Sequence, residues 1–184
     1  MKPMVLDNVV SDEELFFLYK EIIGSNGWSL VGRSSGEELA HTFKEFNNLP
    51  MFRIKADTPD AILNYPLYLY FQSIIFRLKN SLREKNIGLP HLMKRAWINA
   101  SYNGAKAHWL HYDNVDPNCK TILLFLTPVW ETAWRGSFYV EGEKFSFKPG
   151  SAVIFDSKDW HCGEEPESST QNWLRLTANI MVGK

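Results

Sequence analysis

The hydrophobic pattern of this 184-residue chain changes once, near Pro90. Before this point apolar residues recur at helical spacing, most clearly over residues 67–85, where they fall on one face of a helix. After it, short segments rich in β-branched and aromatic residues alternate with turns that contain glycine or proline. A chain with helices first and strands second is typical of an α+β fold, in which helices cover one face of a sheet.

Local signals place the individual elements. Residues 11–14 and 35–38 both match the capping box and predict helices over 11–24 and 35–46. Pro59 predicts another helix start, and Pro66 interrupts or restarts that helix. Strands are predicted at 28–31, 51–56, 95–102, 106–112, 121–127, 136–141, 144–147, 152–155 and 173–181. The seven strands after Pro90 are typical of a β-sandwich or an open barrel.

Composition predicts one folded domain over residues 1–184. Hydrophobic residues make up 45% of the chain and aromatic residues 14%, which is enough for a substantial core. No repeat, linker or low-complexity segment divides the chain. We therefore expect 1–90 to form a mainly helical support and 91–184 to form the β core.

Charge and hydropathy exclude two classes of partner. The net charge is −1 with no basic stripe, so we expect no nucleic-acid partner. Apolar runs such as 122–126 are too short to cross a bilayer, and the N-terminus lacks the apolar region of a signal peptide. We expect a cytoplasmic protein with Cys119 and Cys162 as free thiols. No feature of the sequence specifies an oligomeric state.

His111 and Asp113 lie two residues apart, and on an extended chain such residues point to the same side. The imidazole and the carboxylate would then converge on one point, as ligands of a divalent metal do. His161, on a polar loop after the predicted strand 152–155, is the candidate third ligand. Two histidines and one carboxylate with an open face suit non-heme Fe(II). The alternatives are a capping Asp113 beside a partly buried His111, and a solvated His161.

Arg175 lies in a predicted strand whose two faces differ. One face is aliphatic and belongs to the core beneath the helices, and the other points into the barrel. That second face carries Trp173, Arg175, Thr177 and Asn179. A buried arginine needs an anion, and its planar fork grips a carboxylate, to which Thr177 could add a hydroxyl. The alternatives are an ion pair with Glu131 or Glu141, and an outward-facing Arg175.

Taken in order, residues 102–180 resemble the iron(II)/2-oxoglutarate-dependent oxygenase superfamily, particularly its prolyl-hydroxylase-like branch. The matching residues are Tyr102-Asn103-Gly104, His111-Tyr112-Asp113, Leu123 to Thr127, Trp130-Glu131, Trp134 to Phe138, Pro149-Gly150, Val153 to Ser157, Trp160-His161 and Arg175-Leu176-Thr177. The match covers roughly the C-terminal half of the chain. Its specificity lies in the order and spacing of the set.

The resemblance implies a double-stranded β-helix (jelly roll) with N-terminal helices packed on one sheet. It implies Fe(II) held by His111, Asp113 and His161, and 2-oxoglutarate held by Arg175 with help from Tyr102 and Thr177. Those three metal ligands and Arg175 would be the catalytic residues. Dioxygen is the second co-substrate, and ascorbate is a further candidate cofactor. The implied reaction hydroxylates a peptide or protein residue, a prolyl residue among the candidates, or a small molecule, and converts 2-oxoglutarate to succinate.

Three positions depart from patterns common in these enzymes. Arg175 stands where hydroxylases of the collagen type use lysine, and Phe125 stands where some oxygen-sensing relatives have tyrosine. Arg135-Gly136 replaces a frequent Gly-Gly pair. The alternative functions are a cupin-like metal-binding protein, isomerase or sugar-binding module without oxygenase activity, and an interaction protein that keeps only the fold.

Overall fold

The computed structural model describes residues 1–25, 28–31, 51–55, 65–101, 110–164, 166–167 and 173–184. Three sequence predictions lie wholly or largely outside these ranges: the helix over 35–46, the helix start at Pro59 and the strand over 106–112. Tyr102 also lies outside them. Within the described residues, no helix is both long enough and apolar enough to cross a membrane.

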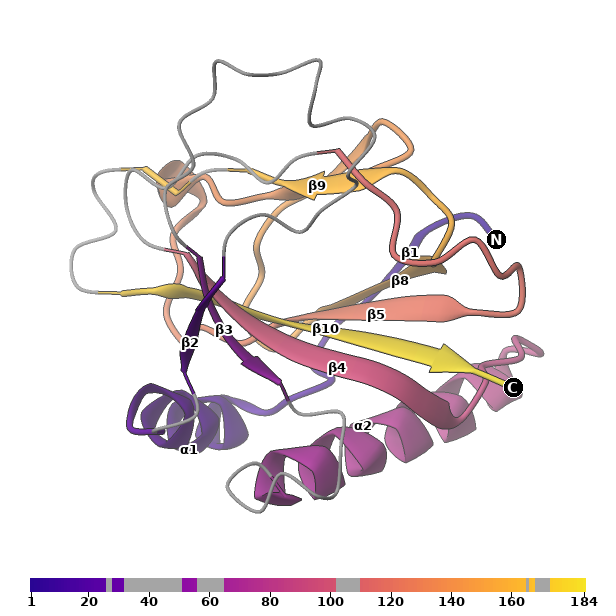
Figure 1. The fold of residues 1–184 in the computed structure, drawn as a ribbon, viewed down its shortest axis with the longest axis horizontal. Helices are drawn as coiled ribbons and strands as arrows, with labels where there is room; N and C mark the ends of the chain where they lie inside the picture. The colour runs from indigo at the N-terminus through magenta and orange to yellow at the C-terminus, as the bar shows by residue number, and fades with distance from the viewer. Residues whose placement is uncertain (26–27, 32–50, 56–64, 102–109, 165, 168–172) are drawn as a thin grey trace.

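Two antiparallel sheets form the body of the protein. The larger has the order β1 (Met4–Leu6), β8 (Ala152–Asp156), β5 (Lys120–Phe125), β10 (Arg175–Gly183), β4 (Leu92–Ser101), β3 (Met51–Lys55) and β2 (Ser29–Val31). The smaller has the order β7 (Glu143–Phe145), β6 (Phe138–Val140) and β9 (His161–Gly163). Figure 1 shows the smaller sheet above the larger one.

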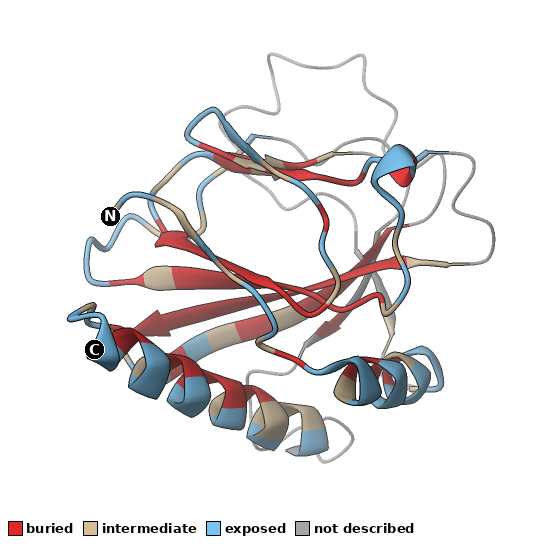
Figure 2. Ribbon diagram, turned by 180° about the vertical axis from the view of Figure 1, so that it is seen from behind, coloured by how far each residue is buried: buried red, intermediate tan, exposed pale blue. Residues whose placement is uncertain are grey.

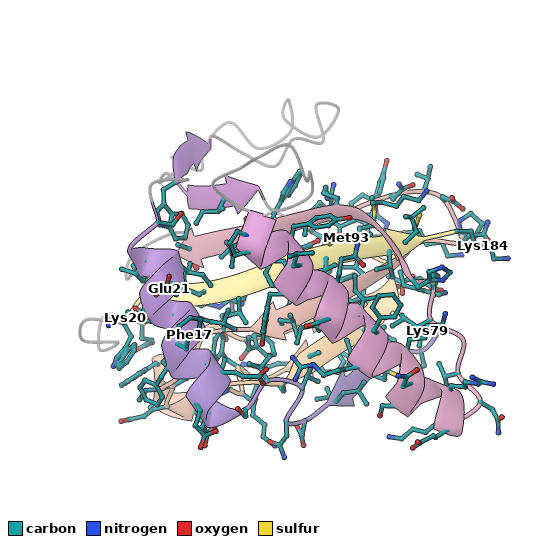
Figure 3. The ribbon with its side chains drawn as sticks, turned by 90° about the horizontal axis from the view of Figure 1, so that it is seen from below. Phe17, Lys20, Glu21, Lys79, Met93 and Lys184 are labelled. Atoms are coloured by element: carbon teal, nitrogen blue, oxygen red, sulfur yellow. The ribbon has the colours of Figure 1, made fainter. Side chains whose placement is uncertain are left out.

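Two helices cover the outer face of the larger sheet. They are α1 (Asp12–Ile23) and α2 (Tyr65–Glu84), and a short 3₁₀ helix, η1 (Thr132–Trp134), precedes β6. Figure 3, seen from below, shows α1 and α2 lying across the strands of the larger sheet. The predicted capping box of α1 is present, since Ser11 Oγ accepts a bond from Glu14 N and the Glu14 carboxylate accepts one from Ser11 N. Helix α2 begins at Tyr65, so Pro66 lies in its first turn, where a missing N–H is harmless.

The first hydrophobic core lies between the helices and the larger sheet. The buried residues of α2 repeat at helical spacing: Phe71, Ile74, Ile75, Leu78 and Leu82. Figure 2 shows the buried side of each helix turned toward the sheet. Leu176, Ala178 and Ile180 of β10 join this core. The prediction that the aliphatic face of this strand packs beneath the helices is confirmed.

A second core fills the space between the two sheets. Its buried members are Leu123, Phe125, Phe138, Val140, Phe147, Val153 and Phe155. Four of the seven come from β5 and β8 of the larger sheet, two come from β6 of the smaller sheet, and Phe147 lies between β7 and β8. Aromatic and aliphatic groups therefore wall the interior of the barrel. Arg175, Thr177 and Asn179 occupy the face of β10 opposite the aliphatic one, and all three are buried.

The structure corrects two sequence predictions. His161 was expected on a polar loop, but it opens β9, which pairs antiparallel with β6. The strand is only three residues long and has polar neighbours, so no alternation revealed it. The N-terminal part also contributes β1, a strand that was not predicted, which pairs with β8 at one edge of the larger sheet.

We predict that Phe71→Ala lowers the free energy of unfolding by about 3–5 kcal/mol, because it leaves a cavity beneath the sheet. The matched control is Phe76→Ala on the same helix, where the side chain is 53% exposed. We expect the control to change the free energy by less than about 0.5 kcal/mol. Urea unfolding measures both. Equal losses in the two variants would contradict the proposed packing of α2.

Candidate metal centre and anion site

Three of the predicted site residues meet in the structure. His111, Asp113 and His161 each offer one ligand atom, and these atoms lie within 4.8 Å of one another. His161 Nε2 is 3.6 Å from an Asp113 carboxylate oxygen, and both side chains are buried. The two imidazole rings have centroids 4.3 Å apart. Cys162, the neighbour of His161, takes no part in this cluster.

Backbone hydrogen bonds hold the two halves of the cluster together. His111 N donates to His161 O at 3.0 Å, and His161 N donates to His111 O at 2.8 Å. Asp113 N and Asn114 N both donate to the carbonyl of Ser157, at 2.8 and 3.0 Å. The His-x-Asp segment is therefore fixed against the connection between β8 and β9, although 50 residues separate the two histidines in the chain.

His161 has the protonation state that a metal ligand needs. Burial lowers its pKa to about 4, and the nearby Asp113 carboxylate offsets this only in part, so the imidazole is neutral at pH 7. Nδ1 lies 2.8 Å from the carbonyl of Asp159, and we assign the proton to Nδ1 on that contact. Nε2 then carries the lone pair. It is buried without a hydrogen-bond partner among the described residues, as a metal-binding nitrogen would be before the ion is bound.

The carboxylate of Asp113 is held by three further side chains. Arg95 forms an ion pair with one oxygen. Thr121 Oγ1 and Asn179 Nδ2 donate to the other, at 2.8 and 3.2 Å. Burial alone would raise the pKa of Asp113, but His161 and these partners together lower it, so the group is a carboxylate at neutral pH.

Sequence reasoning did not identify Arg95 or Thr121 as part of the site. Each lies on a strand that contacts Asp113 only after the sheet is assembled. Asn179 was placed on the correct face of β10, and the alternation of that strand was the signal that could have identified it as a partner of the cluster.

Arg175 is buried inside the barrel, and no carboxylate among the described residues contacts it. Its Nε donates to the carbonyl of Gly136 at 2.7 Å, and its guanidinium carbon lies 5.5 Å from the centre of the Phe147 ring. Desolvation lowers its pKa to about 10, which leaves the group charged at pH 7. Nη2 is buried and has no hydrogen-bond partner in the described part of the chain. A buried donor of this kind is costly to leave unpaired, and a ligand carboxylate would satisfy it.

The alternative ion pairs for Arg175 are not formed. Glu131 and Glu141 are both exposed, and no ion pair of Arg175 occurs within the ranges that the structure describes. The charged group that acts on Arg175 is Glu164, at longer range.

The cluster and Arg175 lie beside the same face of β10. Asn179 contacts Asp113, and Arg175 lies four residues away on the same face of β10, a separation of roughly 13 Å along an extended strand. Thr177 lies between them, buried and paired in register with Phe125. The site thus combines metal ligands at one end with a cation at the other. A small molecule that chelates metal and carries a distant carboxylate matches both ends.

Comparisons with known proteins agree with this architecture. No family model matches the chain, and no curated protein matches it by sequence. Among the solved structures that match the chain, three that each cover 98% of it illustrate the likeness. An oxidoreductase of the 2OG-Fe(II) oxygenase family from Burkholderia pseudomallei has a TM-score of 0.69 and 11% identity, with 84% of that chain covered. A prolyl hydroxylase from Trichoplax adhaerens, in complex with a hypoxia inducible factor peptide fragment, has a TM-score of 0.63 and 15% identity, with 83% covered.

The third structure is HygX from Streptomyces hygroscopicus with nickel and 2-oxoglutarate bound. Its TM-score is 0.62 and its identity 11%, with 82% of that chain covered. At these identities the likeness shows the fold: this chain is a double-stranded β-helix of the kind found in 2-oxoglutarate-Fe(II) oxygenases. The fold class predicted from the sequence is confirmed.

We predict that Thr121→Val weakens the binding of a divalent metal by about 10- to 100-fold, because it removes one donor that orients the Asp113 carboxylate. Calorimetric titration of the chelator-treated protein with Mn(II) measures the change in the dissociation constant. Thr132→Val, at an exposed position in η1, is the matched control and should bind Mn(II) like the wild type. Equal affinities in the two variants would exclude an orienting role for Thr121.

We predict that the metal-free protein loses stability as the pH falls from about 6.5 to about 4. In this window the unfolded chain binds a proton on residue 161 that the folded protein does not, because burial lowers the pKa of His161. The loss is on the order of 3 kcal/mol and ends near pH 4. Urea unfolding in the presence of a chelator measures it. His161→Gln should give a shallower pH dependence, and an unchanged slope would contradict a buried neutral imidazole.

Proposed function

We propose that this chain is an Fe(II)- and 2-oxoglutarate-dependent oxygenase that hydroxylates a peptide or protein residue or a small molecule. The observation that carries the proposal is the pairing of two features beside one face of β10. One is the His111, Asp113 and His161 cluster. The other is the buried Arg175, whose Nη2 has no partner among the described residues. A metal ion and a ligand carboxylate would satisfy both.

His111, Asp113 and His161 would hold the iron, and Arg175 would hold the far carboxylate of 2-oxoglutarate. Three protein ligands leave coordination positions for the keto acid and for dioxygen. Iron and 2-oxoglutarate, when bound, supply the oxidising chemistry that inserts oxygen into a substrate C–H bond and yields succinate. Thr177 remains the candidate second contact for the carboxylate, and Tyr102 remains a candidate from its sequence position.

The chain itself contributes orientation, charge and apolar surroundings. The backbone bridge between His111 and His161 keeps the ligand atoms within reach of one ion. The aromatic groups of the inter-sheet core wall the space around Arg175, since Phe125 and Phe147 pack with ring centroids 4.6 Å apart. Phe125 lacks the hydroxyl that a tyrosine would offer. Arg175 would therefore provide most of the binding interaction with the far carboxylate of 2-oxoglutarate.

The buried guanidinium also separates this function from its main alternative. A cupin-like metal-binding protein or isomerase needs metal ligands but has no use for a buried cation four residues further along β10. The cost of burying Arg175 with no carboxylate in contact among the described residues argues for an anionic ligand. For the substrate we propose a peptide or a small molecule, with a prolyl residue as one candidate. One neighbour in this fold is a prolyl hydroxylase bound to a peptide fragment.

We predict that anaerobic Fe(II) and 2-oxoglutarate together give the protein a weak visible charge-transfer band. Arg175→Ala should weaken 2-oxoglutarate binding at least about 10-fold while leaving the affinity for Mn(II) close to that of the wild type. Asp113→Ala should abolish the band and weaken Mn(II) binding. His91→Ala, which alters an exposed histidine outside the cluster, is the control and should keep both properties.

Two results would contradict the proposal. Wild-type protein that binds Mn(II) but shows no band and no affinity for 2-oxoglutarate would favour a metal-binding protein of another class. Arg175→Ala with unchanged 2-oxoglutarate affinity would remove the co-substrate assignment. Succinate formation by the iron-loaded protein in air, with or without a substrate, tests the reaction itself.

A further inference from the structure

The side chain of Arg175 makes one hydrogen bond within the described residues, and its acceptor lies in an unusual turn. The turn is residues 135–137, between η1 and β6, and we call it the arginine-holding turn. Gly136 has a φ of +75°, and its carbonyl accepts the bond from Arg175 Nε at 2.7 Å. Because Nε is occupied, only the terminal nitrogens of the guanidinium remain for a ligand carboxylate.

We propose that Gly136 and Trp130 are positioning residues for Arg175, which make its guanidinium present its terminal nitrogens to the far carboxylate of a keto diacid. This inference rests on the proposed function.

The space around Gly136 leaves no room for a side chain. A Cβ at this position would lie 2.8 Å from Trp130 Cζ2, 3.1 Å from Arg175 Cδ and 3.2 Å from Arg175 Nε. The first distance is too short for any Cβ contact, and its partner is a rigid ring. An alanine would therefore push the Trp130 ring, the Arg175 side chain or the turn itself out of place. The positive φ adds a second cost.

Trp130 holds the other side of the turn. Its Nε1 donates to the carbonyl of Arg135 at 2.9 Å. Its ring stacks on Phe147 with centroids 4.5 Å apart, and Phe147 in turn lies beneath the Arg175 guanidinium. The indole thus connects the backbone of the arginine-holding turn to the Phe147 ring, which lies beneath the Arg175 guanidinium. A phenylalanine could keep the packing but not the hydrogen bond.

Glu164 ties the turn to the end of β9. Its carboxylate accepts a bond from Ser137 N at 3.0 Å and forms an ion pair with Arg135 Nε at 3.3 Å. Arg135 has a φ of 57° and a ψ of −135°, a conformation that residues other than glycine rarely adopt. The ion pair with Glu164, and the hydrogen bond that the Arg135 carbonyl accepts from Trp130 Nε1, hold Arg135 in this conformation.

Glu164 also provides negative charge near Arg175 without touching it. The guanidinium is therefore partly neutralised at a distance while its terminal nitrogens stay available. A carboxylate in direct contact would compete with the ligand, whereas the Gly136 carbonyl does not.

The test compares Gly136→Ala with Gly142→Ala in protein loaded with Mn(II) under anaerobic conditions. Gly142 has a φ of +79° and nothing within 4 Å of a built Cβ, so this variant carries the same backbone cost without the steric clash. Calorimetry with 2-oxoglutarate should show a dissociation constant about 10- to 100-fold weaker for Gly136→Ala than for Gly142→Ala. The affinities of both variants for Mn(II) should agree with the wild type, which shows that the cluster remains folded.

A second pair of variants keeps the test decisive if Gly136→Ala does not fold. Trp130→Phe removes the Nε1 donor and should weaken 2-oxoglutarate binding by roughly 3- to 10-fold with Mn(II) affinity unchanged. Its control is Trp28→Phe, which removes a similar bond from an indole to the carbonyl of Ile22, near the end of α1. This control should bind both ligands like the wild type.

The outcomes separate the two proposals. Wild-type protein that binds no 2-oxoglutarate overturns the proposed function. Wild-type protein that binds it, with both Gly136→Ala and Trp130→Phe matching their controls, overturns the positioning role and leaves the proposed function standing.

Discussion

The reciprocal backbone bonds between His111 and His161 are the interaction on which the site depends. They join His111, which precedes β5, to the first residue of β9, and the Ser157 carbonyl extends the same contact to Asp113. Backbone hydrogen bonds in a buried setting have little freedom, so the ligand atoms converge without help from an ion. A metal would then meet a preformed set of donors, and its binding energy would not be spent on ordering the chain.

The core beneath the helices stabilises the fold, whereas the space between the two sheets contains the candidate site. The core beneath the helices is built from buried apolar side chains and anchors β10 through its aliphatic face. The space between the sheets accepts Arg175, Thr177 and Asn179 on the other face of the same strand. Because one strand borders both cores, the position of Arg175 relative to Asn179 is set by the strand geometry. Buried atoms that have no partner among the described residues, such as Arg175 Nη2 and His161 Nε2, cost stability in the free protein and mark where ligands are expected.

Much of the fold followed from periodicity. The capping box of α1, the apolar face of α2 and the two faces of β10 were predicted from spacing alone, and the structure confirms them. Strand β9 was missed because three residues with polar neighbours carry no alternation. Arg95 and Thr121 were missed because their partner Asp113 is distant in the sequence, and only the pairing of the strands brings them together.

The sequence by itself determined which residue types could perform the chemistry and which face of each strand they share, because both properties depend on neighbours along the chain. It also contained, in the same order along the chain, the set of residues that resembles the oxygenases. The tertiary structure alone decided that His161 lies against His111, that Asp113 is surrounded by Arg95, Thr121 and Asn179, and that Gly136 holds Arg175. These contacts join segments far apart in the chain. They depend on register and on the close packing of rigid rings, which local patterns do not encode.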